Sequence, residues 1–545
     1  MKRAAGGARL LLAFALAWGA TTAVAADLGE SIYRQALGRG GQPVQAQRSV
    51  DGALQPSAAA CVNCHQRSGL GGREGRITVP PITGRYLFRP RVHDGQAEPV
   101  PFVEGMRGDR DPYDDTTLAR AIREGVDVQG RVLGDVMPRY ALTDAEMAAL
   151  IGYLRQLDPK RTPGVAEGTL HFATIVTPDA DPRRREAMLS VMRQFVADHN
   201  VRQMEPVPAL RSSGRTAYAK SMFMMRRRWE LHVWELTGPE SGWGAQLDRR
   251  LAEEPVFAVL SGLAGRSWAP VHQFCERQQL PCVFPNVDAP PPEADRDFYS
   301  LYYSRGVLLE ADLLAQALAE APPARVLQVW RDGDAGEAGA AALASALAAT
   351  PGPKPVVRGV SLPRAAPPSA VADALRGAAE DTALVLWLRP PDLAALPAQP
   401  PAAKSVHLSG RLGGLEQAPL PPAWRAAALL AYPVDLPEKR RVRVDYARGW
   451  MAARRLPVVD EAVQSDTYLA LGLVAETLGH MTDVFVRDYL VERLQNTLDH
   501  RIITGYYPRL SLAPGQRFAS KGARLVRFAQ ASGTQLAPQT DWLVP

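Results

Sequence analysis

The chain has 545 residues, too many for one hydrophobic core, so its length predicts two or three domains. The formal charge is +6, from 63 basic and 57 acidic residues. No dense Lys/Arg block interleaved with aromatic residues occurs, which argues against nucleic acid as a partner. Part of the positive charge lies in the first nine residues, so the overall basicity says little about function.

The N-terminus predicts an export signal over residues 1–26. Basic residues within positions 2–9 precede an apolar run at 10–18, and small residues at 23–25 suit cleavage near residues 25–26. A transmembrane anchor needs about 20 apolar residues, more than this run or any later one offers. We therefore expect a soluble periplasmic protein without a membrane anchor.

Residues 27–158 predict a small all-α domain. Apolar residues recur at helical spacing in 29–37, 115–125 and 143–157, and the last of these segments opens with a capping box. The prolines and glycine that follow predict a linker at 159–167.

Within this domain, Cys61, Cys64 and His65 form a Cys-x-x-Cys-His motif, which is typical of covalent c-type haem attachment. Two thiols on one turn can each bond a vinyl group, and the adjacent imidazole can bind the iron. A zinc site would need a second ligand pair, and Cys275 and Cys282 have the wrong spacing for one. One haem c per chain is expected.

The domain resembles class I cytochromes c across residues 29–157. The resemblance consists of the Gly-x-x-Ile-Tyr helix at 29–33, the haem motif, and Met137-Pro138 before a C-terminal helix. In that family the methionine of the Met-Pro turn is the sixth iron ligand, so the resemblance implies His65 and Met137 as axial ligands.

Other residues remain as alternatives for the iron. Met147 lies on an apolar helical face, Met106 has no following proline, and His93 would give a bis-histidine haem. The family also binds its proximal histidine to a proline carbonyl, for which Pro80 or Pro81 is the candidate.

From residue 168 onward, strands alternate with helices, which predicts a parallel sheet with helices on both faces. Strands are expected at 170–176, 231–236, 255–260, 281–284, 326–330 and 383–388, and helices at 183–199, 243–253, 268–278, 306–320 and 336–349. Proline-rich segments at 289–293, 363–368 and 390–401 are expected to be surface loops.

The order of these elements resembles type I periplasmic binding proteins, the fold of branched-chain amino acid binding proteins, within a domain spanning 168–545. The resemblance implies one lobe from about 168–297 plus 430–500 and another from 298–429 plus 501–530. Residues 466–470 resemble a first-lobe helix that commonly carries Tyr-Asp-Ala, but Leu469 replaces the acid, which weakens the inference of an amino acid ligand.

Such proteins bind ligands between their lobes, at loops beyond strand C-termini. Hydroxyls and exposed backbone N–H groups there suit carboxylates, so a small polar or anionic solute is expected. The candidate contacts are Ser261, Gly262, Ser267, Tyr303, Ser304 and Arg305.

Cys275 and Cys282 are expected to form a disulfide. The compartment is oxidising, the other two thiols are committed to haem, and no further cysteine can pair with either.

The sequence thus favours an electron carrier with a fused solute-binding or docking module, rather than an enzyme. Its redox partners would be a periplasmic dehydrogenase and a downstream cytochrome or oxidase. The alternative is a solute receptor for an importer or sensor, with haem as a redox cue. A haem peroxidase would need an open sixth position and usually more than one haem, whereas one motif occurs here.

Overall fold

The computed structural model describes residues 28–48, 52–74, 77–88, 111–157, 162–204, 227–292, 297–481, 484–513 and 515–544. The chain forms two compact units. Among the described residues, the first comprises those within 28–162 and 481–492, and the second comprises those within 163–204, 227–480 and 493–544. Within the described residues, every helix is too short or too polar to cross a membrane.

The first unit has helices packed around one core. That core joins helix 28–35, α4 and α5 through residues such as Ile32, Leu118 and Leu150. Side-chain capping boxes begin both α4 and α5. In chain order, the elements after helix 28–35 are η1 (Arg39–Gly41), β1 (Gln45–Arg48), β2 (Gly52–Ala53), η2 (Pro56–Ala59), α2 (Val62–His65), β3 (Gly72–Glu74), β4 (Ile77–Val79), α3 (Gly84–Phe88), α4 (Asp115–Glu124), β5 (Arg139–Ala141) and α5 (Asp144–Gln156).

The expectation of an all-α domain is wrong. β1 pairs antiparallel with both β2 and β5, and β3 pairs with β4. These strands are two to four residues long, so they cannot show a recognisable period-two pattern. The β1–β5 ladder also joins segments more than 90 residues apart (Gln45 with Ala141), a pairing that local sequence does not encode.

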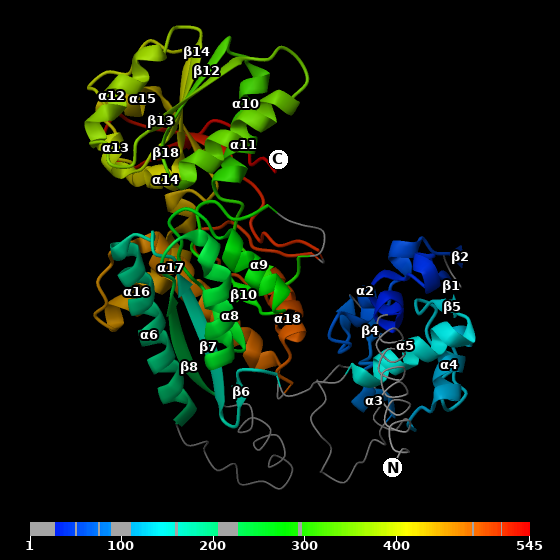
Figure 1. Cartoon of the computed structure of the whole chain (residues 1–545). Helices are drawn as coiled ribbons and strands as arrows, with labels where there is room; N and C mark the ends of the chain where they lie inside the picture. The colour runs from blue at the N-terminus through cyan, green and yellow to red at the C-terminus, as the bar shows by residue number, and fades with distance from the viewer. Residues whose placement is uncertain are drawn as a thin grey trace, which may run out of the picture. The chain divides into compact units, whose positions relative to one another are not determined.

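The second unit contains two α/β lobes, each built on its own sheet (Figure 1). The first sheet has the order β11-β10-β9-β7-β6, and β8 pairs with β7. All its pairings are parallel except β6 with β7. Its elements are β6 (Val165–Ala166), β7 (Thr169–Val176), α6 (Pro182–Met204), β8 (Arg228–Glu235), η3 (Glu240–Gly242), α8 (Trp243–Glu253), β9 (Ala258–Leu260), α9 (Ala269–Arg277), β10 (Cys282–Val283) and β11 (Ser300–Leu301).

Helices cover this sheet on both faces. Alternate residues of β7 and β8, including Ala173, Ile175 and Trp234, share a core with α8 and α9. α6 packs against β8 and against α17 (Glu461–His480), which in turn packs against α16 (Pro437–Ala453). α18 (Arg487–His500) follows α17 in the chain. This layering is the one that buried parallel strands require.

The second sheet has the order β13-β12-β14-β15-β16-β17-β18, parallel up to β16 and antiparallel beyond it. Its elements are α10 (Val307–Glu320), β12 (Arg325–Arg331), α11 (Ala335–Ala349), β13 (Val356–Leu362), η4 (Pro368–Ala370), α12 (Val371–Ala374), η5 (Leu375–Gly377), β14 (Thr382–Trp387), α13 (Pro390–Ala394), β15 (Ser405–Ser409), α14 (Gly410–Gly413), η6 (Leu415–Gln417), α15 (Pro422–Ala427), β16 (Ala428–Tyr432), β17 (Arg524–Phe528) and β18 (Leu536–Pro538).

The lobe boundaries differ from those expected. β11 belongs to the first sheet although it was placed in the second lobe, and β16 and β18 extend the second sheet beyond its expected ends at 429 and 530. β11 is two residues long and is recognisable only through its pairing with β10. The proline-rich segment at 390–401 also begins with α13, whose Leu393 is buried, so it is not purely a surface loop.

Candidate functional site

The haem motif occupies a single helical turn. Cys61 is the N-cap of α2, which ends at His65, and the His65 N–H donates to the Cys61 carbonyl at 2.9 Å. His65 is 6 % exposed, and its Nδ1 lies 3.0 Å from the Pro80 carbonyl oxygen. Of the two prolines considered, Pro80 is therefore the one that holds the ring. This contact leaves Nε2 as the nitrogen available to a metal.

The pKa values of the side chains in the motif are compatible with haem binding. Burial lowers the pKa of His65 to about 4, although the hydrogen bond to Pro80 acts in the opposite direction. The neutral imidazole that binds iron is thus the stable form at physiological pH. Burial also raises the pKa of the Cys61 thiol to about 11, and neither Cys61 nor Cys64 is in a disulfide.

Two tyrosines fix the backbone on either side of this turn. The Tyr33 hydroxyl donates to the Gln66 carbonyl at 2.5 Å, and the Tyr140 hydroxyl donates to the Ala59 carbonyl at 2.7 Å. Both tyrosines are buried core residues. The positions of the thiols and the imidazole are therefore set by the packed core.

Met137 lies on a turn before β5, where its N–H donates to the Gly134 carbonyl at 3.0 Å. The Arg139 guanidinium donates to the Met137 carbonyl and restrains the turn. Met137 is half-buried against the same core that Cys61 contacts. Of the alternatives, Met147 is a buried residue of α5, whereas His93 and Met106 lie outside the described residues.

In the second unit, Ser261 and Tyr303 both reach the N-terminal half of α17. Asn286 Nδ2 donates to Ser261 Oγ at 2.9 Å and to Thr467 Oγ1 at 3.1 Å. The Tyr303 hydroxyl donates to the Asp466 carbonyl at 2.8 Å. The structure thus brings these two predicted residues to one helix. Gly262 beside Ser261 has φ 126°, and a side chain there would meet Trp268 at 2.6 Å.

The Asp466 side chain is the most unusual group of this region. The Tyr507 hydroxyl donates to its Oδ2 at 3.1 Å, but its buried Oδ1 has no hydrogen-bond partner among the described residues. Burial raises the pKa of Asp466 to about 6, against the opposing charge of Arg411. A buried acceptor without a donor is costly, so it indicates a place for a ligand or water.

Three arginines converge on the carboxylate of Asp288, which follows β10. Arg184 of α6 lies 3.1 Å away, Arg389 after β14 lies 3.0 Å away, and Arg411 of α14 lies 3.2 Å away. Burial alone would raise the pKa of Asp288, but the three guanidiniums outweigh it and hold the pKa well below its usual range. Because Arg184 belongs to the first lobe and the other two to the second, the cluster joins both lobes.

Three predicted residues have other partners. The Ser267 hydroxyl donates to Glu240 at 2.8 Å, and Ser304 Oγ accepts the Gly306 N–H at 3.2 Å. Arg305 is half-exposed and forms an ion pair with Asp312 on its own following helix at 2.6 Å. The cations that do gather between the lobes are Arg184, Arg389 and Arg411, which sequence reasoning missed.

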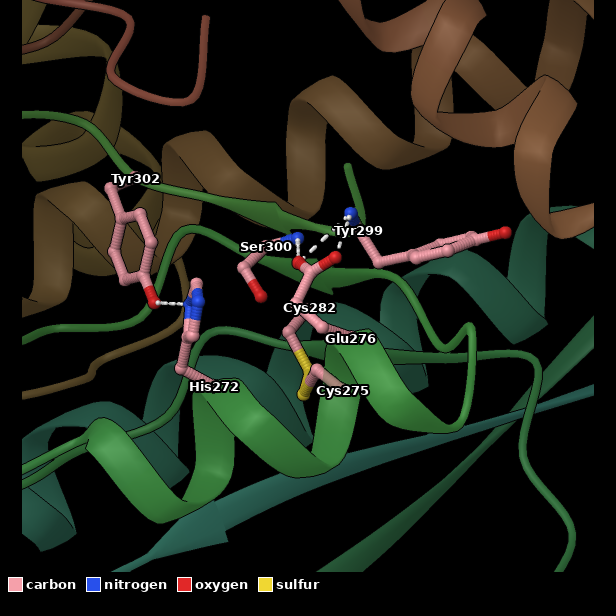
Figure 2. The surroundings of a disulfide bond; sticks show 7 residues. All are labelled: His272, Cys275, Glu276, Cys282, Tyr299, Ser300 and Tyr302. Atoms are coloured by element: carbon pink, nitrogen blue, oxygen red, sulfur yellow. Dashed lines mark hydrogen bonds between the residues drawn. A yellow bond between two sulfur atoms is a disulfide. The ribbon is translucent and has the colours of Figure 1, made fainter. Parts of the chain in front are cut away.

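Cys275 of α9 and Cys282 of β10 form a disulfide with a Cα–Cα distance of 6.2 Å (Figure 2). Beside it, the Glu276 carboxylate accepts backbone N–H groups of Phe298, Tyr299 and Ser300, at 2.7 Å for Ser300. These bonds tie α9 to the segment that enters β11, next to the disulfide.

Residues 49–158 match the family model of cytochrome c. Over 79 residues the chain is 34% identical to the protein-export protein SecB of Azotobacter vinelandii, a match that covers 14% of this chain and 48% of SecB. The chain therefore spans about half the length of the curated relative it matches, and we take no function from that match.

Solved structures similar to this chain include substrate-binding proteins of transporters. A fatty acid ABC transporter substrate-binding protein from Thermomonospora curvata is 13% identical, with a TM-score of 0.47, covering 71% of this chain and 95% of that one. A branched chain amino acid ABC transporter protein from Thermus thermophilus with bound valine is 10% identical, with a TM-score of 0.47, covering 69% and 97%. These likenesses are distant, so the description of the fold rests on the sheet topology above. Residues 49–158 thus match the cytochrome c family model, and the second unit has two α/β lobes, each built on its own sheet.

Proposed function

We propose that the protein is an exported single-haem cytochrome that transfers electrons between periplasmic redox proteins and carries a solute-binding module. The observation that supports the haem site best is the contact between His65 Nδ1 and the Pro80 carbonyl, at 3.0 Å. It fixes a buried imidazole one residue after Cys64, on the turn that carries both cysteines of the motif.

Each residue of the haem site has one role in this proposal. Cys61 and Cys64 would bond the porphyrin covalently, and His65 and Met137 would bind the iron. The haem supplies a one-electron couple. If His65 and Met137 both bind the iron, the haem would have no open position for oxygen or substrate, which favours electron transfer over peroxidase chemistry. A dehydrogenase would be the donor, and another cytochrome or an oxidase the acceptor.

The test is spectroscopic and uses the full chain purified from the periplasm. We expect one haem per chain by the pyridine haemochrome assay, and no carbon monoxide binding to the ferrous protein. Cys61→Ser with Cys64→Ser should leave haem extractable by acidified solvent. Covalent haem retained in that double variant would exclude this motif as the attachment site. Rapid carbon monoxide binding to the wild type would exclude an iron whose two axial positions are both occupied by protein side chains.

For the second unit, we propose a site for a small polar solute at Asp466, Ser261 and Arg411. The unpaired buried Oδ1 of Asp466 calls for a donor from the solute, and Arg411 beside it suits an acceptor or anionic group. The same observation favours the alternative function, a receptor for an importer or sensor in which the haem reports redox state.

A thermal-shift screen with small carboxylates, amino acids and polyols would identify the solute. We expect Asp466→Asn and Ser261→Ala each to weaken its binding at least tenfold. Asp312→Asn is the matched control, because Asp312 pairs with Arg305 outside this cluster, and should leave binding unchanged. Equal affinity in all three variants would refute the site, and failure to bind any solute would favour a docking role for the fold.

A further inference from the structure

A cluster of two histidines and one glutamate lies on the face of the first-lobe sheet that packs against α8 and α9, three to five residues before the C-terminal ends of β7 and β8. On this face Ala173 and Ile175 of β7 are buried under α8 and α9. His171 lies two residues before Ala173 in β7, so its side chain points to the same face of the sheet. The neighbouring strand β8 places Glu230 directly opposite His171, and His232 two residues further on.

The donor atoms of these residues have the spacing of a metal site. His171 Nδ1 lies 3.1 Å from His232 Nε2 and 3.7 Å from Glu230 Oε2, and all three donors lie within 4.8 Å of one another. Zinc binds histidine nitrogen at about 2.0–2.1 Å, so tetrahedral donors stand about 3.3 Å apart. The two separations from His171 Nδ1, 3.1 Å and 3.7 Å, lie on either side of that value.

A second carboxylate lies behind one of the histidines. His232 Nδ1, the nitrogen that faces away from His171, is 3.5 Å from Glu254 Oε1. The indole N–H of Trp234 donates to the other oxygen of Glu254 at 2.8 Å and holds it in place. Carboxylates in this position orient metal-binding histidines through the ring nitrogen that does not touch the metal.

We propose that His171, Glu230 and His232 bind a divalent transition-metal ion of the zinc type, with Glu254 as the positioning residue for His232. Two imidazoles and one carboxylate suit zinc. The fourth position remains for water or an external ligand. The three side chains are partly exposed, at 26%, 58% and 16%, so the ion can enter from solvent.

A second group of similar composition does not share these properties. In the group of His272, Glu276 and Asp297, the Glu276 oxygens already accept three backbone N–H groups. His272 also has both ring nitrogens engaged. Its Nδ1 lies 2.9 Å from the Tyr302 hydroxyl (Figure 2), and its Nε2 lies 3.2 Å from Asp297. That group therefore serves the fold around the disulfide.

The test is zinc binding to the full-length haem-loaded protein, measured by chelator competition and by elemental analysis after desalting. We expect one zinc per chain in the wild type. His171→Ala and His232→Ala should each weaken binding at least 100-fold, and Glu254→Gln should weaken it about tenfold. His500→Ala, which removes a surface histidine of α18, should leave the zinc affinity unchanged. Zinc should also raise the melting temperature of the wild type but not of His232→Ala.

Two results would overturn the proposal. One is a zinc affinity of the wild type no tighter than that of His232→Ala, which would show that His171 and His232 only form a hydrogen bond with each other. The other is zinc binding that survives in His171→Ala and His232→Ala but is lost in His272→Ala. Circular dichroism of each variant would establish that it is folded, so that lost binding reports on the site itself.

Discussion

Asp288 shows at the level of one residue how strongly the interior depends on charge balance. Its carboxylate is almost fully buried and is surrounded by three guanidiniums from both lobes. A buried carboxylate and its cations lose their hydration on folding, and only close pairing offsets that cost. Removing the carboxylate would leave the positive charges of Arg411 and its neighbouring arginines buried and less well compensated.

We predict that Asp288→Asn lowers the free energy of unfolding by about 3 kcal/mol or more, as for other broken buried pairs. The half-exposed pair of Arg305 and Asp312 provides the control, and Asp312→Asn should cost less than about 1 kcal/mol. Because the folded pKa of Asp288 is depressed, its stabilisation is present above the unfolded pKa of about 4 and is lost as the pH falls. Urea unfolding of both variants at pH 7 would measure the difference, and equal losses would contradict it.

Met137 provides a second prediction at this scale. If it is the sixth iron ligand, Met137→His should lower the reduction potential, because a thioether favours ferrous iron relative to imidazole. Met137→Ala should open the iron to added imidazole or cyanide. The ferric wild type should show the near-infrared sulfur-to-iron band, and its persistence in Met137→Ala would show that another residue holds the iron. Met147→Leu, in the core of α5, is the control and should retain the band.

At the scale of elements, the disulfide joins the last turn of α9 to the start of β10. The closed loop is short, so the chain-entropy contribution is only about 2.5 kcal/mol. We predict that denatured, unreduced protein exposes neither thiol to titration. The variant with Cys275→Ala and Cys282→Ala should unfold with a free energy lower by about that amount. Two titratable thiols in the wild type would contradict the prediction.

The first turn of α10 carries a buried acid, Glu310, that makes stability depend on pH. Burial raises the pKa of Glu310 to about 8, despite hydrogen bonds from the Ser409 hydroxyl and from the Arg411 N–H at 2.8 Å. Between its unfolded pKa of about 4.3 and this folded value, the folded state binds more protons than the unfolded state. Stability should therefore fall as the pH rises through this window.

We predict that Glu310→Gln removes this component of the pH dependence. Relative to the variant, the wild type should lose up to about 1.4 kcal/mol per pH unit between pH 5 and pH 8. Asp312→Asn, two residues further along α10, should leave the pH dependence unchanged. Parallel curves for the wild type and Glu310→Gln would show that Glu310 does not titrate in this range.

At the scale of the whole molecule, the local patterns of the sequence determined the haem motif and many of the regular elements. Cys61, Cys64 and His65 lie on one turn, so their spacing in the sequence already brings them together. Likewise β7 and α8 lie within a few residues of their expected ranges, because periodicity acts over a single element. The division into a unit that carries the Cys-x-x-Cys-His motif and a two-lobed unit follows from where these patterns change.

Only the tertiary structure decided which side chains meet. Asp288 is separated from Arg184, Arg389 and Arg411 by 104, 101 and 123 residues, and the sequence pointed instead to Arg305. His171 and Glu230 meet through the register of two parallel strands, which a crossover of more than 50 residues separates. Such contacts depend on strand order and on the packing of distant segments, whereas propensity and periodicity act only between near neighbours in the chain.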